Sequence, residues 1–314
     1  MNSPMKHAHR LVIFFSAMLL CDIVLGSRLT AQGPVRSDAK TMTLGIVSEI
    51  NQKEIERHFQ PFVRYVAGKL SSSSKIDGMT VVAPSQSRLA GLLTERKADF
   101  YMESPHPTFM INSVYGAGKL LLRRWKGGVG DYHAVIFSSN NGETKRLNDL
   151  KGKIIAFEDP ESTSGYFLPK LFLTKQGFKL SPKARTEATV AGSETGYIFA
   201  QSSEKIVDLV LSRKVAAGAF SSDDYAALDP GKKSAIAILG ETASLPRHLV
   251  STRRDLPAER TRGLEKILLA MHQNPEGLSI LQKTDGTTKF DALPGGELAV
   301  SQRLLDTYYT PQKK

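Results

Sequence analysis

The sequence predicts an α/β protein made of two successive series of strands and helices. Short apolar or β-branched stretches alternate with segments whose apolar residues recur every three or four positions, which is the pattern of strands connected by helices. A cluster of glycines at 127, 128 and 130 separates the two series, as expected where a chain crosses between lobes. We therefore expect two lobes, each with a mainly parallel sheet covered by helices on both faces.

The first series precedes the glycine cluster. An apolar strand is followed by a segment whose apolar residues fall on one helical face. A second unit of the same kind follows, and a third strand ends the series. The expected strands span residues 43–47, 80–83 and 100–102, and the expected helices span 55–70 and 89–93.

The second series begins directly after the glycine cluster, with a strand expected to cross between the lobes. Apolar and small-residue strands then alternate with two helical faces. The expected strands span residues 132–138, 154–157, 217–220 and 236–239, and the expected helices cover 167–172 and 206–210.

The chain is expected to return to the first lobe near its end. Residues 246–252 carry it back, and the remaining segment is predicted to be helical because its apolar residues between 264 and 271 form one stripe. We therefore assign residues 40–130 and 240–314 to the first lobe and residues 131–239 to the second.

The N-terminus has the features of a secretory signal. A basic start precedes an apolar run at residues 11–25, which is too short to span a bilayer comfortably. Cleavage is expected after Gly26 or Ala31, and we assign residues 1–31 to the signal peptide. The protein is then expected in the periplasm or another extracytoplasmic space.

Cys21 is the sole cysteine of the chain. A lipid anchor on Cys21 is an alternative to simple cleavage, although Leu20 stands where the lipidation motif requires a small residue. If Cys21 leaves with the signal, the mature protein has no disulfide, no thiolate metal site and no cysteine nucleophile.

The formal net charge of +11 favours an anionic ligand or an anionic surface. The basic residues are scattered, and pairs such as Arg123-Arg124 lack interleaved aromatic residues. Nucleic-acid binding is therefore not expected.

The most informative motif is Asp-Pro-Glu-Ser-Thr-Ser-Gly-Tyr at residues 159–166, directly after a predicted strand and at the start of a predicted helix. A helix start has unpaired N–H groups and a partial positive charge, so it binds anions. The hydroxyls of Ser162, Thr163 and Ser164 add donors, and Gly165 allows close approach of the backbone. The alternative is a plain N-cap, for which these residue types are also preferred.

Residues 156–166 resemble the phosphonate-binding proteins of ABC importers, in the phosphate, phosphite and phosphonate group. The resemblance covers roughly residues 42–255 and implies a periplasmic-binding-protein type 2 fold, in which two α/β lobes joined by a two-stranded hinge hold a ligand between them. Further segments agree in order and spacing: residues 44–47, 59–62, 98–100, 132–136 and 147–153.

The resemblance also implies which residues bind the ligand. The hydroxyl cluster would hold the oxyanion from the second lobe, and an acidic Glu103, where relatives often have an aromatic residue, would suit a ligand that also carries an amine. Either Glu194 or Glu204 matches an acidic position of the family. The expected site residues are Ser162, Thr163, Ser164, Gly165, Tyr132, Glu103, Ser104, Ser221, Asp223 and Glu204.

The implied function is capture of a phosphonate-like oxyanion for a membrane ABC permease by a monomeric protein, with no cofactor, metal or catalytic residue. A ligand-binding partner of a membrane sensor kinase would use the same cleft and remains an alternative. An enzyme is a weaker alternative, because the sequence lacks the Gly-x-Ser-x-Gly, His-Glu-x-x-His, P-loop and Gly-x-Gly-x-x-Gly motifs.

Overall fold

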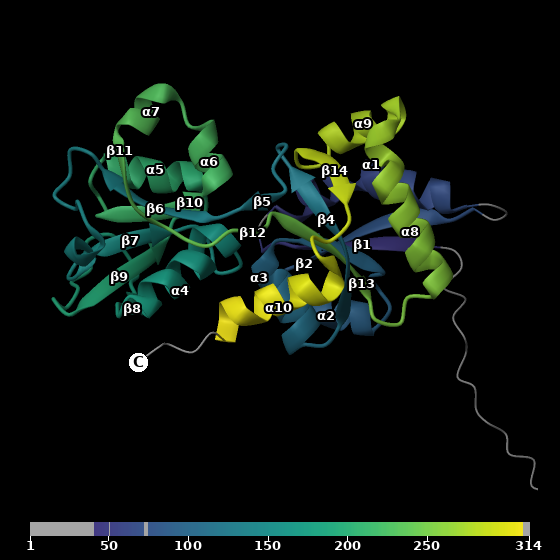
Figure 1. The fold of residues 1–314 in the computed structure, drawn as a ribbon, viewed down its shortest axis with the longest axis horizontal. Helices are drawn as coiled ribbons and strands as arrows, with labels where there is room; N and C mark the ends of the chain where they lie inside the picture. The colour runs from purple at the N-terminus through teal and green to yellow at the C-terminus, as the bar shows by residue number, and fades with distance from the viewer. Residues whose placement is uncertain (1–40, 50, 72–74, 310–314) are drawn as a thin grey trace, which may run out of the picture. The chain divides into compact units, whose positions relative to one another are not determined.

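The computed structural model describes residues 41–49, 51–71 and 75–309. They form two six-stranded sheets with helices packed against them, connected by a two-stranded ribbon (Figure 1). This confirms the prediction of two α/β lobes joined by a two-stranded hinge. The predicted signal peptide, including Cys21, lies outside the described residues. Within the described ranges, no helix has both the length and the apolar character needed to cross a membrane.

The first lobe is built on a sheet with the strand order β14-β4-β13-β3-β1-β2. Strands β1, β2 and β3 are parallel, whereas β13 is antiparallel to β3 and β4, and β14 is antiparallel to β4. Segments on either side of the second lobe in the sequence therefore share one sheet. The strands are β1 (Thr41–Val47), β2 (Asp77–Ala83), β3 (Phe100–Glu103), β4 (Gly118–Lys126), β13 (His248–Arg253) and β14 (Thr287–Asp291).

Helices cover both faces of this sheet, and β1 is therefore buried on both sides. Met42 and Leu44 pack with α1, while Gly45 on the opposite face lies under Leu89 of α2, where a Cβ would come within 2.4 Å of that side chain. The helices are α1 (Gln52–Leu70), α2 (Gln86–Thr94), α3 (Pro105–Phe109), η2 (Met110–Val114), α8 (Ala258–Ala270), η5 (Met271–Gln273), α9 (Pro275–Gln282) and α10 (Gly296–Tyr309).

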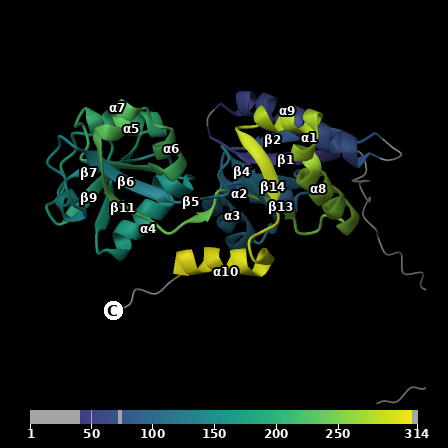
Figure 2. The same cartoon turned by 45° about the horizontal axis from the view of Figure 1, so that its top comes forward.

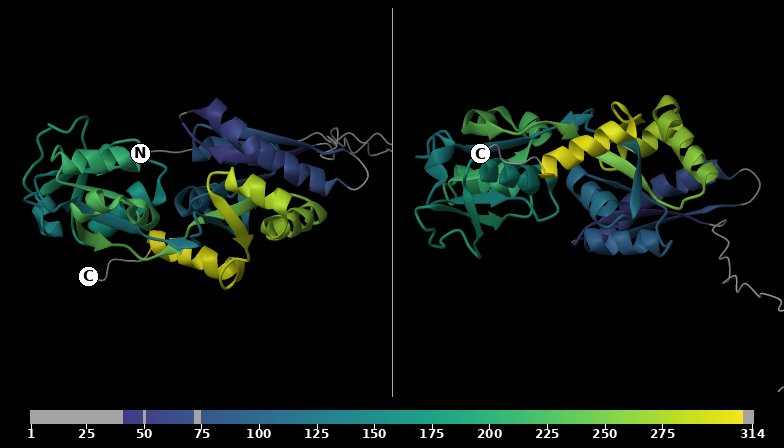
Figure 3. Two further views of the ribbon diagram at one scale, coloured as in Figure 1. Left: turned by 90° about the horizontal axis from the view of Figure 1, so that it is seen from above. Right: turned by 60° about the horizontal axis from the view of Figure 1, so that its bottom comes forward.

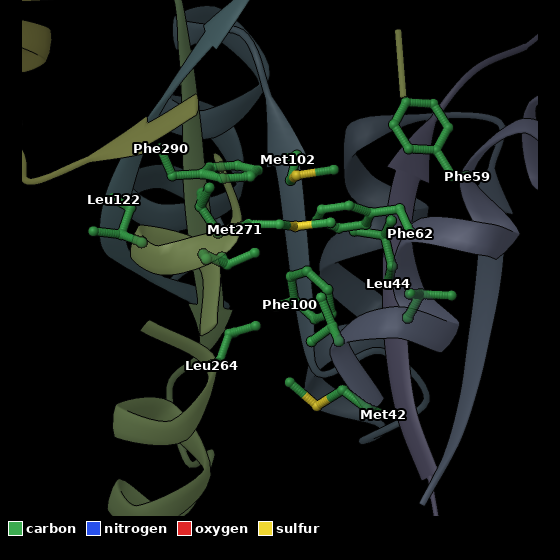
Figure 4. Packing of buried hydrophobic residues seen from close by; sticks show 14 of the residues in the cluster. Met42, Leu44, Phe59, Phe62, Phe100, Met102, Leu122, Leu264, Met271 and Phe290 are labelled. Carbon is green, nitrogen blue, oxygen red and sulfur yellow. The ribbon is translucent and has the colours of Figure 1, made fainter. Parts of the chain in front are cut away.

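Figure 4 shows the larger hydrophobic core of the first lobe. The ring centroid of Phe62 in α1 lies 6.5 Å from that of Phe100 in β3 and 6.0 Å from that of Phe290 in β14. Leu264 and Met271, on the predicted apolar stripe, pack into the same core. The two ends of the chain are therefore held together by one apolar cluster.

The C-terminal segment differs from the prediction at one point. Thr287–Asp291 form β14, so the expectation of a wholly helical segment is wrong there. This strand pairs only with β4, a strand that the sequence analysis also missed. Both strands depend on partners distant in sequence, which local periodicity cannot reveal.

The second lobe is built on a sheet with the strand order β11-β6-β10-β7-β9-β8. Strands β10, β7, β9 and β8 are parallel, and β6 is antiparallel to β10 and β11. The small residues of β10 allow α5 to pack closely, since a Cβ on Gly218 would lie 2.2 Å from Ile206. The strands are β6 (Ala134–Ser139), β7 (Ile154–Phe157), β8 (Lys179–Pro182), β9 (Glu194–Phe199), β10 (Ala217–Ser221) and β11 (Ile236–Glu241). The helices are η3 (Leu147–Leu150), η4 (Thr163–Phe167), α4 (Leu168–Lys175), α5 (Ser203–Leu211), α6 (Ser222–Ala227) and α7 (Pro230–Ser234).

The hinge is the antiparallel pair of β5 (Asp131–Tyr132) and β12 (Leu245–Pro246). Gly127 and Gly128 have positive φ, so the glycine cluster forms a tight turn immediately before the crossing strand. The last helix, α10, packs against α3 (Figure 2). Val300 and Leu304 of α10 share an apolar cluster with Leu245 of the hinge. Figure 3 shows α10 as the yellow helix near the C-terminal end of the chain.

Candidate ligand-binding site

A cavity of about 400 Å³ is lined by residues of both lobes. We call it the cleft. In the first lobe it is bounded by the residues that follow β1, β2 and β3 and by the start of β13, and in the second lobe by the residues that follow β7, β9 and β10. The carboxyl ends of parallel strands meet at one edge of a sheet, which is where open α/β sheets bind ligands. The two sheet edges together enclose the cleft.

The start of the helix formed by η4 and α4 lies on the second-lobe side of the cleft. Ser162 is its N-cap: the hydroxyl accepts a hydrogen bond from the Gly165 N–H at 3.0 Å and donates one to Glu158 Oε2 at 2.7 Å. Thr163 and Ser164 form the first turn, where N–H groups have no carbonyl partner within the helix. Both residues line the cleft, so the positive end of the helix dipole faces it.

Thr163 connects the two lobes. Its side chain is buried, and Oγ1 accepts a hydrogen bond from the His106 N–H at 2.8 Å and donates one to Ser104 Oγ at 2.8 Å. A hydroxyl has a single proton to donate, and here Ser104 receives it. In this conformation Thr163 therefore couples the lobes, while donors for an anion come from the backbone and from Ser164.

A buried cation lies beside the hinge tyrosine. The guanidinium carbon of Arg247 is 4.4 Å from the ring centroid of Tyr132, and its Nε donates to Asp223 Oδ2 at 2.8 Å. Burial acts to lower the pKa of Arg247, but Tyr132 and Asp223 outweigh it and raise that pKa above its ordinary range. Arg247 and Tyr132 both line the cleft, which places a permanent positive charge in its wall.

Several carboxyl groups also line the cleft, and burial raises the pKa of four of them. Burial raises the pKa of Glu103 to about 8, and the Val47 N–H donates to its Oε1 at 2.6 Å. Burial likewise raises the pKa values of Glu158, Asp159 and Glu161. Glu103 is therefore mostly protonated at neutral pH, so it repels an anion much less than an ionised glutamate would.

Six of the residues expected from the sequence line the cleft together: Glu103, Ser104, Tyr132, Ser162, Thr163 and Ser164. Gly165 is not among the lining residues. Its role in the structure is close packing, because a Cβ at this position would lie 2.5 Å from Glu158 Cβ.

The other expected residues lie outside the cleft lining. Ser221 is the N-cap of α6 and accepts a hydrogen bond from the Asp224 N–H, and Asp223 reaches the cleft only through Arg247. Glu204 is exposed in the first turn of α5. Glu194 lies at the amino end of β9, the end remote from the cleft.

Sequence analysis missed the basic residues of the site. Arg247 and His248 line the cleft at the start of β13, and Lys126 lines it at the end of β4. The available signal was a polar pair directly before the apolar run at residues 249–250. Its meaning depends on β13 inserting antiparallel between β3 and β4, which the sequence alone does not show. Across the described part of the chain, no cluster of three or more His, Cys, Asp or Glu side chains could hold a metal ion.

The family comparison agrees with this geometry. Residues 44–294 match the model of the family described as ABC transporter, phosphonate, periplasmic substrate-binding protein. The chain belongs to this family. A phosphonate-family binding protein is a transport component that works with an ABC permease, and the expectation drawn from the resemblance is confirmed at this level. No curated protein matches the chain at a significant level.

Solved structures show the same type 2 periplasmic-binding-protein fold. XAC2383 from Xanthomonas citri, bound to ATP, has a TM-score of 0.78 at 23% identity, covering 86% of this chain and 97% of that one. The binding component of a phosphonate ABC transporter from Pseudomonas aeruginosa has a TM-score of 0.62 at 17% identity, covering 85% of both chains. PhnD1 from Prochlorococcus marinus, in complex with methylphosphonate, has a TM-score of 0.60 at 16% identity, covering 85% of this chain and 99% of that one.

Proposed function

We propose that the chain captures a phosphonate oxyanion in the cleft and delivers it, as a monomer without cofactor or catalytic step, to an ABC permease. Residues 1–31 would export it and leave the mature protein in the periplasm. The observation that carries the proposal is that the first turn of η4 and the Arg247 guanidinium line one cavity. A helix start and a buried guanidinium are the two groups that most favour a tetrahedral oxyanion.

Binding would replace the hydration shell of the oxyanion with protein donors. The N–H groups of Thr163 and Ser164, the Ser164 hydroxyl and the Arg247 guanidinium are the donors at hand. Hydrogen bonds to charged groups contribute about 1.5–3 kcal/mol each, so several together support micromolar or tighter affinity. A ligand that contacts both lobes favours the closed arrangement over an open one.

Isothermal titration calorimetry on the unfolded, washed and refolded mature protein tests the proposal. The ligands are phosphate, phosphite, methylphosphonate, 2-aminoethylphosphonate and sulfate. Micromolar or tighter binding of a phosphorus oxyanion, with sulfate much weaker, is the expected result. Stronger binding of the aminoethyl compound than of methylphosphonate would indicate that a carboxyl group of the cleft contacts the amine, with Glu103 as the candidate expected from the sequence. Absence of heat with every phosphorus compound would refute oxyanion capture.

A further inference from the structure

A second cavity, which we call the side chamber, lies next to the cleft in the first lobe. Its volume is about 490 Å³. Four residues line both cavities: Val47, Ser48, Glu103 and His248. The side chamber therefore adjoins the cleft on its first-lobe side.

The side chamber has an apolar part and a polar part. Ile46 of β1, Met102 of β3 and the α1 residues Ile55 and Phe59 form the apolar part, and Asn51, Glu54 and His58 are among its polar lining residues. Ile46, Phe59 and Met102 are buried and belong to the main core of the lobe, and Ile55 packs against it. An apolar surface of this kind favours an uncharged, hydrophobic occupant.

The charged residues at the end of the side chamber are satisfied by one another. Arg124, which is 1% exposed, pairs with Asp285 at 3.0 Å and donates to Thr287 Oγ1 at 2.8 Å. Asp285 also pairs with Lys126 at 2.8 Å, and its N–H donates to His58 Nε2 at 2.9 Å. All three guanidinium nitrogens of Arg124 already donate to protein acceptors, at Thr287, His248 and Asp285, so this end of the chamber is not expected to select a second anion.

The junction between the two cavities is formed by uncharged groups. Nη1 of Arg124 lies 2.9 Å from Nδ1 of His248. A guanidinium can only donate hydrogen bonds, so His248 Nδ1 is the acceptor. The single proton of the neutral His248 ring is therefore on Nε2. Burial lowers the pKa of His248 well below its usual value. Glu103 is held beside it by the Val47 N–H. An apolar group that lies at this boundary therefore displaces no unpaired charge.

We propose that the side chamber holds the organic substituent on phosphorus, and that the ligand is a phosphonate with an apolar chain or ring rather than a bare or methyl-substituted oxyanion. The inference rests on the proposed function, because the oxyanion in the cleft anchors the ligand. The residues that the chamber shares with the cleft place it within reach of a substituent on the bound oxyanion. Cavities of about 300–1,000 Å³ hold molecules of many heavy atoms, which is far more space than a methyl group fills.

Calorimetry with methylphosphonate, n-butylphosphonate and n-hexylphosphonate tests this inference on the refolded mature protein. Each methylene transferred from water into an apolar site tightens binding about threefold to fourfold. The hexyl compound has five more methylenes than the methyl compound, so it is expected to bind at least about 200-fold more tightly if all five are buried and at least about tenfold more tightly if only two are. Equal affinities for the three compounds would overturn the side-chamber assignment while leaving oxyanion capture intact. Binding of none of them would overturn both.

Two variants on α1 locate the effect. Ile55→Trp fills the chamber from its α1 wall, and the ratio of methyl to hexyl dissociation constants is expected to fall to about one. Ile55→Glu places a charge in the same wall and is expected to do likewise. Glu56→Trp is the matched control, since Glu56 is exposed on the same helix and does not line the chamber, so it should preserve the ratio. If both Ile55 variants fold and still prefer the hexyl compound, the alkyl group of the ligand does not lie in the side chamber.

Discussion

Thr163 Oγ1 donates a hydrogen bond to Ser104 Oγ at 2.8 Å. Thr163 begins η4 in the second lobe, and Ser104 directly follows β3 in the first. A hydrogen bond of this length between the lobes forms only when the two sheet edges are brought together. The same hydroxyl accepts from the His106 N–H, so one side chain satisfies two groups of the opposite lobe.

Thr163→Val is expected to weaken phosphonate binding by about 10-fold to 100-fold without unfolding the protein. Valine keeps the shape of threonine but leaves the part-buried His106 N–H without its Thr163 acceptor, which costs about 1–3 kcal/mol in the closed form. Calorimetry and a thermal melt monitored by circular dichroism measure the two effects. Thr174→Val, at an exposed position of the same helix, is the control. Unchanged affinity in the Thr163 variant would contradict the proposed coupling.

Arg247→Gln is expected to reduce oxyanion affinity by roughly 10-fold to 150-fold, the equivalent of one charge-assisted hydrogen bond. The variant removes the positive charge beside Tyr132 while keeping a polar side chain. Arg262→Gln, at an exposed position of α8, removes the same charge far from the cleft. If the Arg247 and Arg262 variants bind the oxyanion with the same affinity, Arg247 has no direct role in binding it.

Glu103 is expected to make stability fall as pH rises from about 4.5 to 8. Burial raises its pKa to about 8 from 4.5, so the folded state binds more protons than the unfolded state in this window. Stability then decreases by at most about 1.4 kcal/mol per pH unit for this one group.

Urea unfolding of wild-type protein and Glu103→Gln at pH 5, 6.5 and 8.5 measures the effect. The variant retains an acceptor for the Val47 N–H, and its stability relative to wild type should increase steadily toward pH 8.5. Glu56→Gln, at an exposed position, should show no such trend. A constant difference across the three pH values would show that Glu103 titrates normally.

Tyr308→Ala is expected to destabilise the protein by about 2–3 kcal/mol, because it removes an aromatic ring packed between the lobes. Tyr308 stacks on Phe109 of the first lobe, with centroids 3.6 Å apart, and on Phe167 of the second, 4.2 Å apart. Urea unfolding measures the loss. Tyr309→Ala removes the neighbouring ring, which is 66% exposed, and should lower the free energy of unfolding much less. Equal losses in the two variants would mean that packing of Tyr308 between the lobes does not stabilise the protein.

The start of η4 was predictable because its signals are local. Ser162 caps the helix through the Gly165 N–H three residues away, and such a cap is specified by neighbouring residues alone. The repeated strand and helix patterns were predictable for the same reason, since each is a short periodic segment. The position of Glu194 and Glu204 outside the cleft lining was not predictable, because it depends on how β9 and α5 are oriented toward the cleft.

By itself, the sequence determined two α/β series, a crossing after the glycine cluster and a polar helix start suited to an oxyanion. Only the tertiary structure revealed Arg247, His248 and the side chamber, because β13 returns from the hinge to lie between β3 and β4. It also showed that Thr163 bonds to Ser104 across the lobes. The physical reason is that hydrogen bonds and burial act through space, so groups far apart in the chain form a site only after both sheets and the hinge have formed.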